Sequence, residues 1–307
     1  MTTVLGIDAA WTATQPSGVA LVSSVGGVWR LIFAGASYRH LLIYADEGVI
    51  STSRPSGSIA EPAALLAASG KIAGAPVDLV AVDMPLSREP IAARRVSDNL
   101  VSAAYGARHC STHTPSAIRP GKISDDLRRG FEHCGYGLLT RKVSAPGLLE
   151  VYPHPALVEL MRVDKRLPYK QAKTRNYWPT ETPSNRRRKL FESWRVIVTS
   201  LDLEVEGVSN VLQLPPLEAP SWQLKAFEDM LDAVICAWVG ICFFEGCAVP
   251  FGDDTSAIWI PHPELLGSRP GRSRSGWRRP VTAERLGGVS RFDNVLNDGY
   301  AATAEDR

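Results

Sequence analysis

Three apolar runs of the chain each reach an acidic residue at their ends. "VLGID" ends at Asp8, "VDLVAVD" at Asp83 and "GLLE" at Glu150. If these runs are strands of an α/β sheet, the three acids gather at its carboxyl edge although they are far apart in sequence. A carboxylate buried without a partner is costly and tends to take up a proton. The pattern therefore predicts acids that are either solvated or share a cation.

Two further acids lie on the longest helical candidate, the stretch from Ser221 to Glu245. In "EDMLDAVICAW", Asp229 and Asp232 are three residues apart, so they share one face of a helix. The helix from Met230 onward is otherwise apolar on nearly every side. Because acids are rarely buried without a partner, these two are also candidates for a functional site.

Each of these acids has an ordinary structural interpretation as well. Asp8 and Asp83 could be turn or helix-cap residues, a common role for an aspartate after a strand. Glu150 could pair with an arginine, and Asp229 with Lys225 one helical turn earlier. We prefer the functional interpretation because the acids occur together, in the order strand, strand, strand, buried helix.

Converging carboxylates repel one another unless cations neutralise them. Hard oxygen ligands favour Mg²⁺ or Mn²⁺, and two such ions about 4 Å apart can activate a water and stabilise the leaving oxygen in phosphodiester cleavage. The catalytic candidates are Asp8, Asp83, Glu150 and Asp232. The metal-ligand candidates are Asp8, Asp83, Asp229 and Asp232. The sequence thus predicts a metal-dependent nuclease.

Basic residues provide candidate contacts to a nucleic acid. The segment "KRLPYKQAKTR" at 165–175 is interleaved and followed by Tyr169, Tyr177 and Trp178, a mixture typical of surfaces that bind a phosphate backbone and stack bases. The substrate-binding candidates are Lys170, Lys173, Arg175, Arg94 and His113, with Arg95 as an alternative phosphate contact. A solvated helix face is the competing interpretation of this charge run.

The histidines and cysteines form a weaker pattern. "RHCSTHTPS" places His109, Cys110 and His113 close together, and His133 and Cys134 follow some way on. Zinc sites usually separate paired ligands by two to four residues, whereas here His and Cys are adjacent, so a polar loop near the active site is favoured over zinc. His154 of "YPHP" could orient a ligand or serve the structure alone.

The order of predicted elements indicates an α/β fold with a mixed sheet flanked by helices. We expect an antiparallel three-strand meander over 2–37 and helices at 60–73 and about 89–105. Further strands are expected in the runs at 77–85, 147–155 and 256–261, and helices after Pro155 and over 221–245. A domain over 1–266, with an insertion at about 86–146, would then be followed by a basic flexible tail at 267–307.

Bulk properties fit a globular protein of ordinary composition. The 307 residues are 45% hydrophobic and carry a formal net charge of only +2. Five cysteines, an odd number, indicate reduced thiols and a cytoplasmic setting. The longest apolar stretch, 233–244, is too short to cross a bilayer, and no signal peptide is apparent, so no membrane partner is expected.

Together, "GIDAAW", "AVDMPLS", "EVYPHPAL" and "EDMLDAVICAW" resemble the domain of unknown function 429 family, predicted nucleases of the ribonuclease H-like superfamily. The resemblance covers most of residues 3–261. It implies metal-binding acids on the first strand, the fourth strand and a late helix, which fall on Asp8, Asp83 and Asp232 with Asp229 as an accessory. "DMLDA" is similar to the helix motif of RuvC-type junction resolvases. The superfamily core does not require Glu150.

The expectation is therefore a ribonuclease H-like nuclease that uses Mg²⁺ or Mn²⁺ and acts on DNA or RNA. Two alternatives stay open: a non-catalytic nucleic-acid-binding or interaction module of the same fold, and an actin-like-fold phosphotransferase. The latter would need a second glycine-rich phosphate loop, which we do not find in the sequence. Oligomeric state is not indicated.

Overall fold

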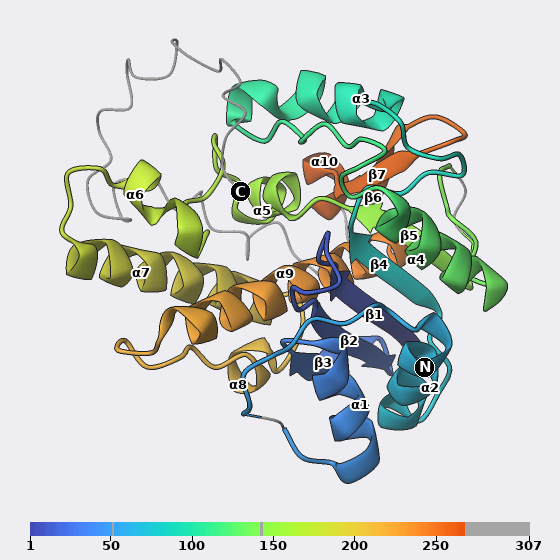
Figure 1. Ribbon diagram of the computed structural model, residues 1–307, viewed down its shortest axis with the longest axis horizontal. Coiled ribbons are helices and arrows are strands. Elements are labelled where there is room, and N and C mark those ends of the chain that lie inside the picture. Colours follow the sequence, from blue (N-terminus) through green and yellow to red (C-terminus); the bar gives the residue numbers. More distant parts are fainter. Residues whose placement is uncertain (51, 142–143, 268–307) are drawn as a thin grey trace.

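A mixed seven-stranded sheet forms the centre of the protein in a computed structural model (Figure 1). The structure describes residues 1–50, 52–141 and 144–267. The strands are β1 (Thr2–Asp8), β2 (Gly18–Val25), β3 (Val28–Gly35), β4 (Leu79–Asp83), β5 (Gly147–Val151), β6 (Ala248–Gly252) and β7 (Ala257–Pro261). Their order across the sheet is β3-β2-β1-β4-β5-β7-β6.

The predicted meander and the parallel strands that follow it are confirmed. β1, β2 and β3 pair antiparallel, whereas β1, β4, β5 and β7 run parallel. Strand β6, which was not predicted from the sequence, pairs antiparallel with β7 at one edge of the sheet. This strand contains Pro250, which has no backbone N–H to donate. An edge strand can hold a proline because its outer side forms no hydrogen bonds with a neighbouring strand.

Helices cover both faces of the sheet. They are α1 (Tyr38–Glu47), α2 (Pro62–Ala73), α3 (Val96–Tyr105), α4 (Lys122–His133), α5 (Pro153–Met161), α6 (Thr174–Tyr177), α7 (Pro183–Asp202), α8 (Val208–Val211), α9 (Ser221–Phe244) and α10 (Pro263–Leu266), with short 3₁₀ turns η1 (Gly106–Arg108) and η2 (Gln171–Lys173). The helices expected at 60–73 and 221–245 are confirmed as α2 and α9. The one expected at about 89–105 begins only at Val96, where the Asp98 carboxylate accepts a hydrogen bond from the Arg95 backbone N–H at 2.9 Å.

Strict alternation along β1 assigns its side chains to two different cores. Val4 packs in the cluster that contains α9, whereas Leu5 and Ile7 pack with α1, α2 and α4 on the opposite face. This is the two-residue periodicity of a strand. Since both faces are covered by helices, β1 is apolar without alternation from Val4 to Ile7, as a strand buried on both faces should be.

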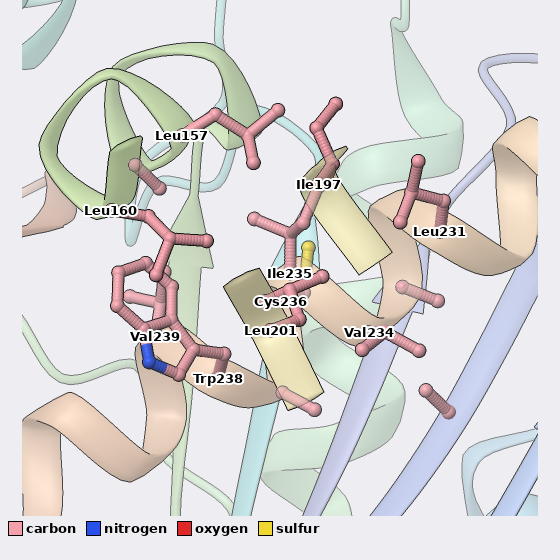
Figure 2. Packing of buried hydrophobic residues seen from close by; sticks show 14 of the residues in the cluster. Leu157, Leu160, Ile197, Leu201, Leu231, Val234, Ile235, Cys236, Trp238 and Val239 are labelled. Carbon is pink, nitrogen blue, oxygen red and sulfur yellow. The ribbon is translucent and has the colours of Figure 1, made fainter. Parts of the chain in front are cut away.

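The α9 side holds the larger core. Figure 2 shows Leu231, Ile235 and Trp238 of α9 facing residues of α5 and α7, which pack on the outer side of α9. A helix enclosed in this way is apolar nearly all round, which explains the sequence of α9 after Met230. The side chains of α9 that are not apolar therefore need a specific partner.

Two glycines allow α9 to approach the sheet closely. A Cβ at Gly6 would overlap the Ala233 carbonyl oxygen, and one at Gly18 would overlap the backbone of Asp229. Backbone thus meets backbone at the crossing of α9 with β1 and β2. The register of this crossing determines which residues of α9 lie beside the carboxyl end of β1.

Residues 86–146, the expected insertion, contain α3, η1 and α4. The expected flexible tail at 267–307 lies, from residue 268, outside the described residues. Within the described ranges, no helix is both long and apolar enough to cross a membrane.

We predict that Gly18→Ala destabilises the protein by about 3 kcal/mol, because the new methyl group forces α9 away from β2 or strains the backbone. Gly137→Ala is the matched control, since a Cβ there has nothing within 4 Å and should change stability by less than about 1 kcal/mol. Urea denaturation followed by circular dichroism measures both. Equal losses for the two variants would contradict the role of the close crossing.

Candidate active site

Asp8 and Asp83 lie side by side at the carboxyl ends of two neighbouring parallel strands. They are register partners in the pairing of β1 with β4. Each continues the alternation of residues that face α9, Val4 and Gly6 in β1 and Leu79 and Ala81 in β4. Both carboxylates therefore point toward α9, and both keep a partly exposed surface.

The close crossing brings the acids of α9 to the same place. Asp229 and Asp232 are only 3% and 0% exposed, and their charges act on Asp8. Glu228, which the sequence analysis missed, is also buried beside them. Its position next to Asp229 on a buried helix was the signal that could have identified it.

Burial and mutual repulsion both raise the pKa values of these acids. Burial raises the pKa of Asp8 well above its usual range, and the nearby charges of Asp232 and Asp229 act in the same direction. Burial and the charge of Asp232 raise the pKa of Asp83 to about 7. Burial also raises the pKa of Asp229 to about 6, against the opposing effect of Lys225. Without a cation, part of this cluster therefore holds protons near neutral pH.

Two lysines offset part of the negative charge. The Lys225 ammonium is paired with Asp229 and lies 3.3 Å from a Glu228 oxygen. The Lys170 ammonium is paired with Asp232 and lies 3.6 Å from Glu228. The structural alternative for Asp229, a pair with Lys225, is thus present in the molecule. Lys170, a substrate-binding candidate, lies inside the carboxylate cluster rather than on an open basic surface.

Glu150 lies on the other face of the sheet from the aspartates, although it lines the same cleft as Asp83 and its charge acts on Asp83. It is the register partner of Val82, and its side chain shares the face of Leu148, opposite the face that α9 covers. In a strand, a difference of one position reverses the direction of the side chain. Glu150 was grouped with Asp8 and Asp83 because all three follow apolar runs, but it lies within β5, one residue before its end.

Arg95 occupies both oxygens of Glu150. Its two terminal nitrogens donate to the carboxylate at 2.6 and 2.7 Å, and the Leu86 N–H donates at 2.8 Å. Arg95 also pairs with Asp98 at 2.9 Å. Burial raises the pKa of Glu150, and the Arg95 guanidinium opposes this shift. The alternative use of Arg95 as a phosphate contact is therefore wrong for this arrangement, since its donors are committed within the protein.

A cleft of about 210 Å³ opens at the carboxyl ends of β4 and β5. Asp83 and Lys170 contribute to its wall, together with His113, Tyr152 and His154. Ligands of α/β proteins commonly bind at this end of the sheet. The cleft thus gives a ligand access to the carboxylate cluster from the side of Asp83.

His154 is an unusual part of the cleft wall. It is 7% exposed, its ring meets the rings of Tyr152 and Tyr169 edge to face, and its Nδ1 has no hydrogen-bond partner within the described part of the chain. Burial lowers the pKa of His154 well below its usual range, and the charge of Arg166 acts in the same direction. The imidazole is therefore neutral at physiological pH.

The other substrate-binding candidates are dispersed. His113 is exposed at the cleft, whereas Lys173 and Arg175 are exposed on η2 and α6. Arg94 is held by neighbouring groups, among them Asn99 at 2.7 Å and Thr114 at 3.1 Å, so its donors serve the local loop.

The aromatic residues expected to stack bases are mostly unavailable. Tyr169 and Trp178 belong to the α9 core and are 0% and 7% exposed. Tyr177 packs against this core. The prediction of base stacking by Tyr169 and Trp178 is therefore wrong, because these rings serve the core of the protein.

A zinc site is not formed by the His–Cys pairs. Cys110 packs in a core with α3 and β7, whereas Cys134 packs against the core under α1 and α2. Across the described residues, no three His, Cys, Asp or Glu side chains are close enough together to form a ready-made metal site.

Two acids of the carboxylate cluster could nevertheless hold one hard divalent cation. Mg²⁺ is usually held through one or two carboxylates together with water and substrate phosphate, not by a cage of protein ligands. Asp8 and Asp83 supply such a pair, and burial, together with the charge of neighbouring acids, raises the pKa of both, so that a cation would favour their charged forms. Asp229 and Asp232 are less suited, because lysines already engage both.

We predict that Arg95→Met destabilises the protein by about 3–5 kcal/mol, since it leaves Glu150 buried without a partner. Arg30→Met is the control, because the Arg30–Glu206 pair is 64% and 59% exposed and such pairs contribute about 1 kcal/mol or less. The free energy of unfolding of both variants, measured by chemical denaturation, distinguishes the buried pair from the exposed one. Similar losses in both variants would argue against a structural role for the Arg95–Glu150 pair.

The raised pKa of Asp83 predicts a pH effect in metal-free protein. Between its ordinary pKa of 3.8 and about 7, Asp83 binds a proton in the folded state but not in the unfolded state. Its contribution to stability therefore falls as pH rises through this window. Asp83→Asn should gain roughly 2–4 kcal/mol relative to wild type between pH 4 and pH 7, measured by urea denaturation in chelator. Asp46→Asn, on an exposed residue, should show no such trend.

Comparison with known proteins gives one match. The profile of the family described as "Protein of unknown function (DUF429)" matches residues 135–257. No curated protein and no solved structure is significantly similar to the chain. The matched segment runs from before β5 into β7 and includes Lys170 and the acids of α9, whereas Asp8 and Asp83 precede it. Over residues 135–257, the chain is therefore similar to the DUF429 family.

Proposed function

We propose that the protein is a divalent-metal-dependent hydrolase that cleaves phosphodiester bonds in a nucleic acid. The observation that carries the proposal is the placement of Asp8 and Asp83, register partners at the carboxyl ends of adjacent strands, facing buried acids of α9. Acids on the first strand, the fourth strand and a late helix are the arrangement that the ribonuclease H-like resemblance implies. The meander followed by parallel strands supports the same fold assignment.

Mg²⁺ or Mn²⁺ would be held by Asp8 and Asp83, which both keep some exposed surface, and of which Asp83 lines the cleft. Such an ion supplies charge neutralisation at the phosphate and lowers the pKa of an attacking water. Residues of the chain itself would bind the cation and keep its carboxylate ligands in position. Asp232, fixed by Tyr169 and Lys170, and Asp229, fixed by Lys225, maintain the negative potential that attracts the cation.

The substrate phosphate would enter through the cleft beside Asp83. Lys170 and His113 lie on the cleft wall, and Lys173 and Arg175 are exposed on η2 and α6, close in sequence to Lys170. Cations near a catalytic cleft favour a polyanion such as DNA or RNA. Glu150 has no place in this scheme beyond holding Arg95, and a metal-binding role for it is not proposed.

We predict that Asp8→Asn lowers Mg²⁺-dependent cleavage at least about 100-fold, because loss of the cation removes several kcal/mol of transition-state stabilisation. The variant should be at least as stable as wild type in chelator, since it removes a carboxylate whose charge the cluster opposes. Cleavage is measured on labelled single-stranded, duplex and junction substrates of DNA and RNA.

Asp46→Asn is the matched control for this experiment. Asp46 lies exposed on α1 and pairs with Lys71 at 3.2 Å, away from the acids of α9. This variant should cleave at the wild-type rate. A folded Asp8→Asn protein that retains full metal-dependent activity would refute the assignment and favour a non-catalytic binding module.

A further inference from the structure

Lys170 lies where a cation would be expected in the carboxylate cluster. Its ammonium pairs with Asp232 and lies 3.6 Å from Glu228. The charge of Lys170 also acts on Asp8 and Asp83, so it is close to all the acids that the proposed function uses. Its side chain is 19% exposed and lines the cleft.

The protein holds Lys170 in this position from both sides. The preceding residue, Tyr169, accepts a hydrogen bond from the Trp194 indole through its carbonyl at 2.8 Å and donates its hydroxyl to Asp232 at 2.8 Å. The following residue, Gln171, donates its N–H to Glu228 at 2.6 Å. Because its neighbours are anchored to α7 and α9, Lys170 is a fixed part of the cluster and not a mobile surface lysine.

The charge balance of the cluster leaves room for one divalent ion. Two lysines face five carboxyl groups, those of Asp8, Asp83, Glu228, Asp229 and Asp232. One divalent cation at Asp8 and Asp83 would offset most of the remaining charge. A second ion that used Asp232 would have to displace Lys170, whose buried charge would then lose its partner at considerable cost.

We propose that Lys170 takes the place of a second metal ion, so that the site binds a single divalent cation at Asp8 and Asp83. Its ammonium group faces the cleft and contacts the substrate phosphate from the side opposite the ion. This inference rests on the proposed function, because it concerns how the same site neutralises a phosphodiester. It also accounts for the lysine pairing of Asp232, an acid otherwise expected to bind metal.

The test counts Mn²⁺ ions bound to the full chain by electron paramagnetic resonance. Wild type should bind one Mn²⁺ per chain. Lys170→Met should bind two, because Asp232 becomes available, and the double variant Lys170→Met/Asp232→Asn should return to one. Asp8→Asn should bind none. The titration is repeated with a short phosphorothioate oligonucleotide, and the oligonucleotide alone serves as blank, because the ion relies on phosphate for part of its shell.

A second measurement guards against a variant that does not fold. Asp232→Asn alone should keep one Mn²⁺ per chain, because Asp232 engages Lys170 and not the ion. Lys170→Met should melt at lower temperature than wild type in chelator, and excess Mn²⁺ should restore most of the difference, since the ion replaces the missing charge. If Lys170 had only a structural role, the variant would melt at lower temperature and excess Mn²⁺ would not raise its melting temperature again.

The outcomes separate the inference from the proposed function. Two ions in wild type, one ion in Lys170→Met, or loss of the ion in Asp232→Asn would overturn the role of Lys170 and leave the nuclease proposal standing. No Mn²⁺ bound to wild type, with or without oligonucleotide, would instead overturn the metal site itself.

Discussion

The backbone contact between α9 and the first two strands is the constraint on which the rest of the structure depends. Gly6 and Gly18 remove the side chains that would otherwise separate the helix from the sheet. This approach sets the register of α9 and carries its acids to the carboxyl end of β1. It also explains why α9 is so strongly apolar, since a helix pressed against a sheet and covered by α5 and α7 has almost no solvent-facing side.

Acids buried on such a helix need opposite charges beside them. By this criterion, the acids of the cluster fall into two groups. Asp229 and Asp232 are enclosed and engage lysines, whereas Asp8 and Asp83 retain some exposed surface, and Asp83 lines the cleft. The enclosed acids serve as a fixed electrostatic background. The exposed pair is the part of the cluster that can exchange protons or water for a ligand.

Much of this arrangement was predictable from periodicity, and the parts that were not have physical reasons. Continuous apolar runs identified β1 and β4, and the spacing of Asp229 and Asp232 placed both on one helix face. The direction of Glu150 depended on where β5 ends, and an uncertainty of one residue there reverses the face.

Contacts between residues far apart in the sequence explain the other wrong predictions. Tyr169, Lys170 and Trp178 appeared as part of a basic surface, because nothing local to residues 165–178 indicates that α7 and α9 enclose them. The edge strand β6 was missed because it contains Pro250, a residue that argues against a strand in a local pattern. In each case a tertiary contact overrode a local pattern.

The crossing of β1 with α9 also determines when the site can exist during protein synthesis. β1 is made first and α9 near the end of the described chain, so their contact must wait for the helices between them. A nascent chain that stops before α9 contains Asp8 and Asp83 but has nothing to cover the apolar face formed by Val4, Ala20 and Val22. Uncovered sheet of this kind promotes aggregation. One late helix therefore completes both the carboxylate cluster and the cover of this apolar face.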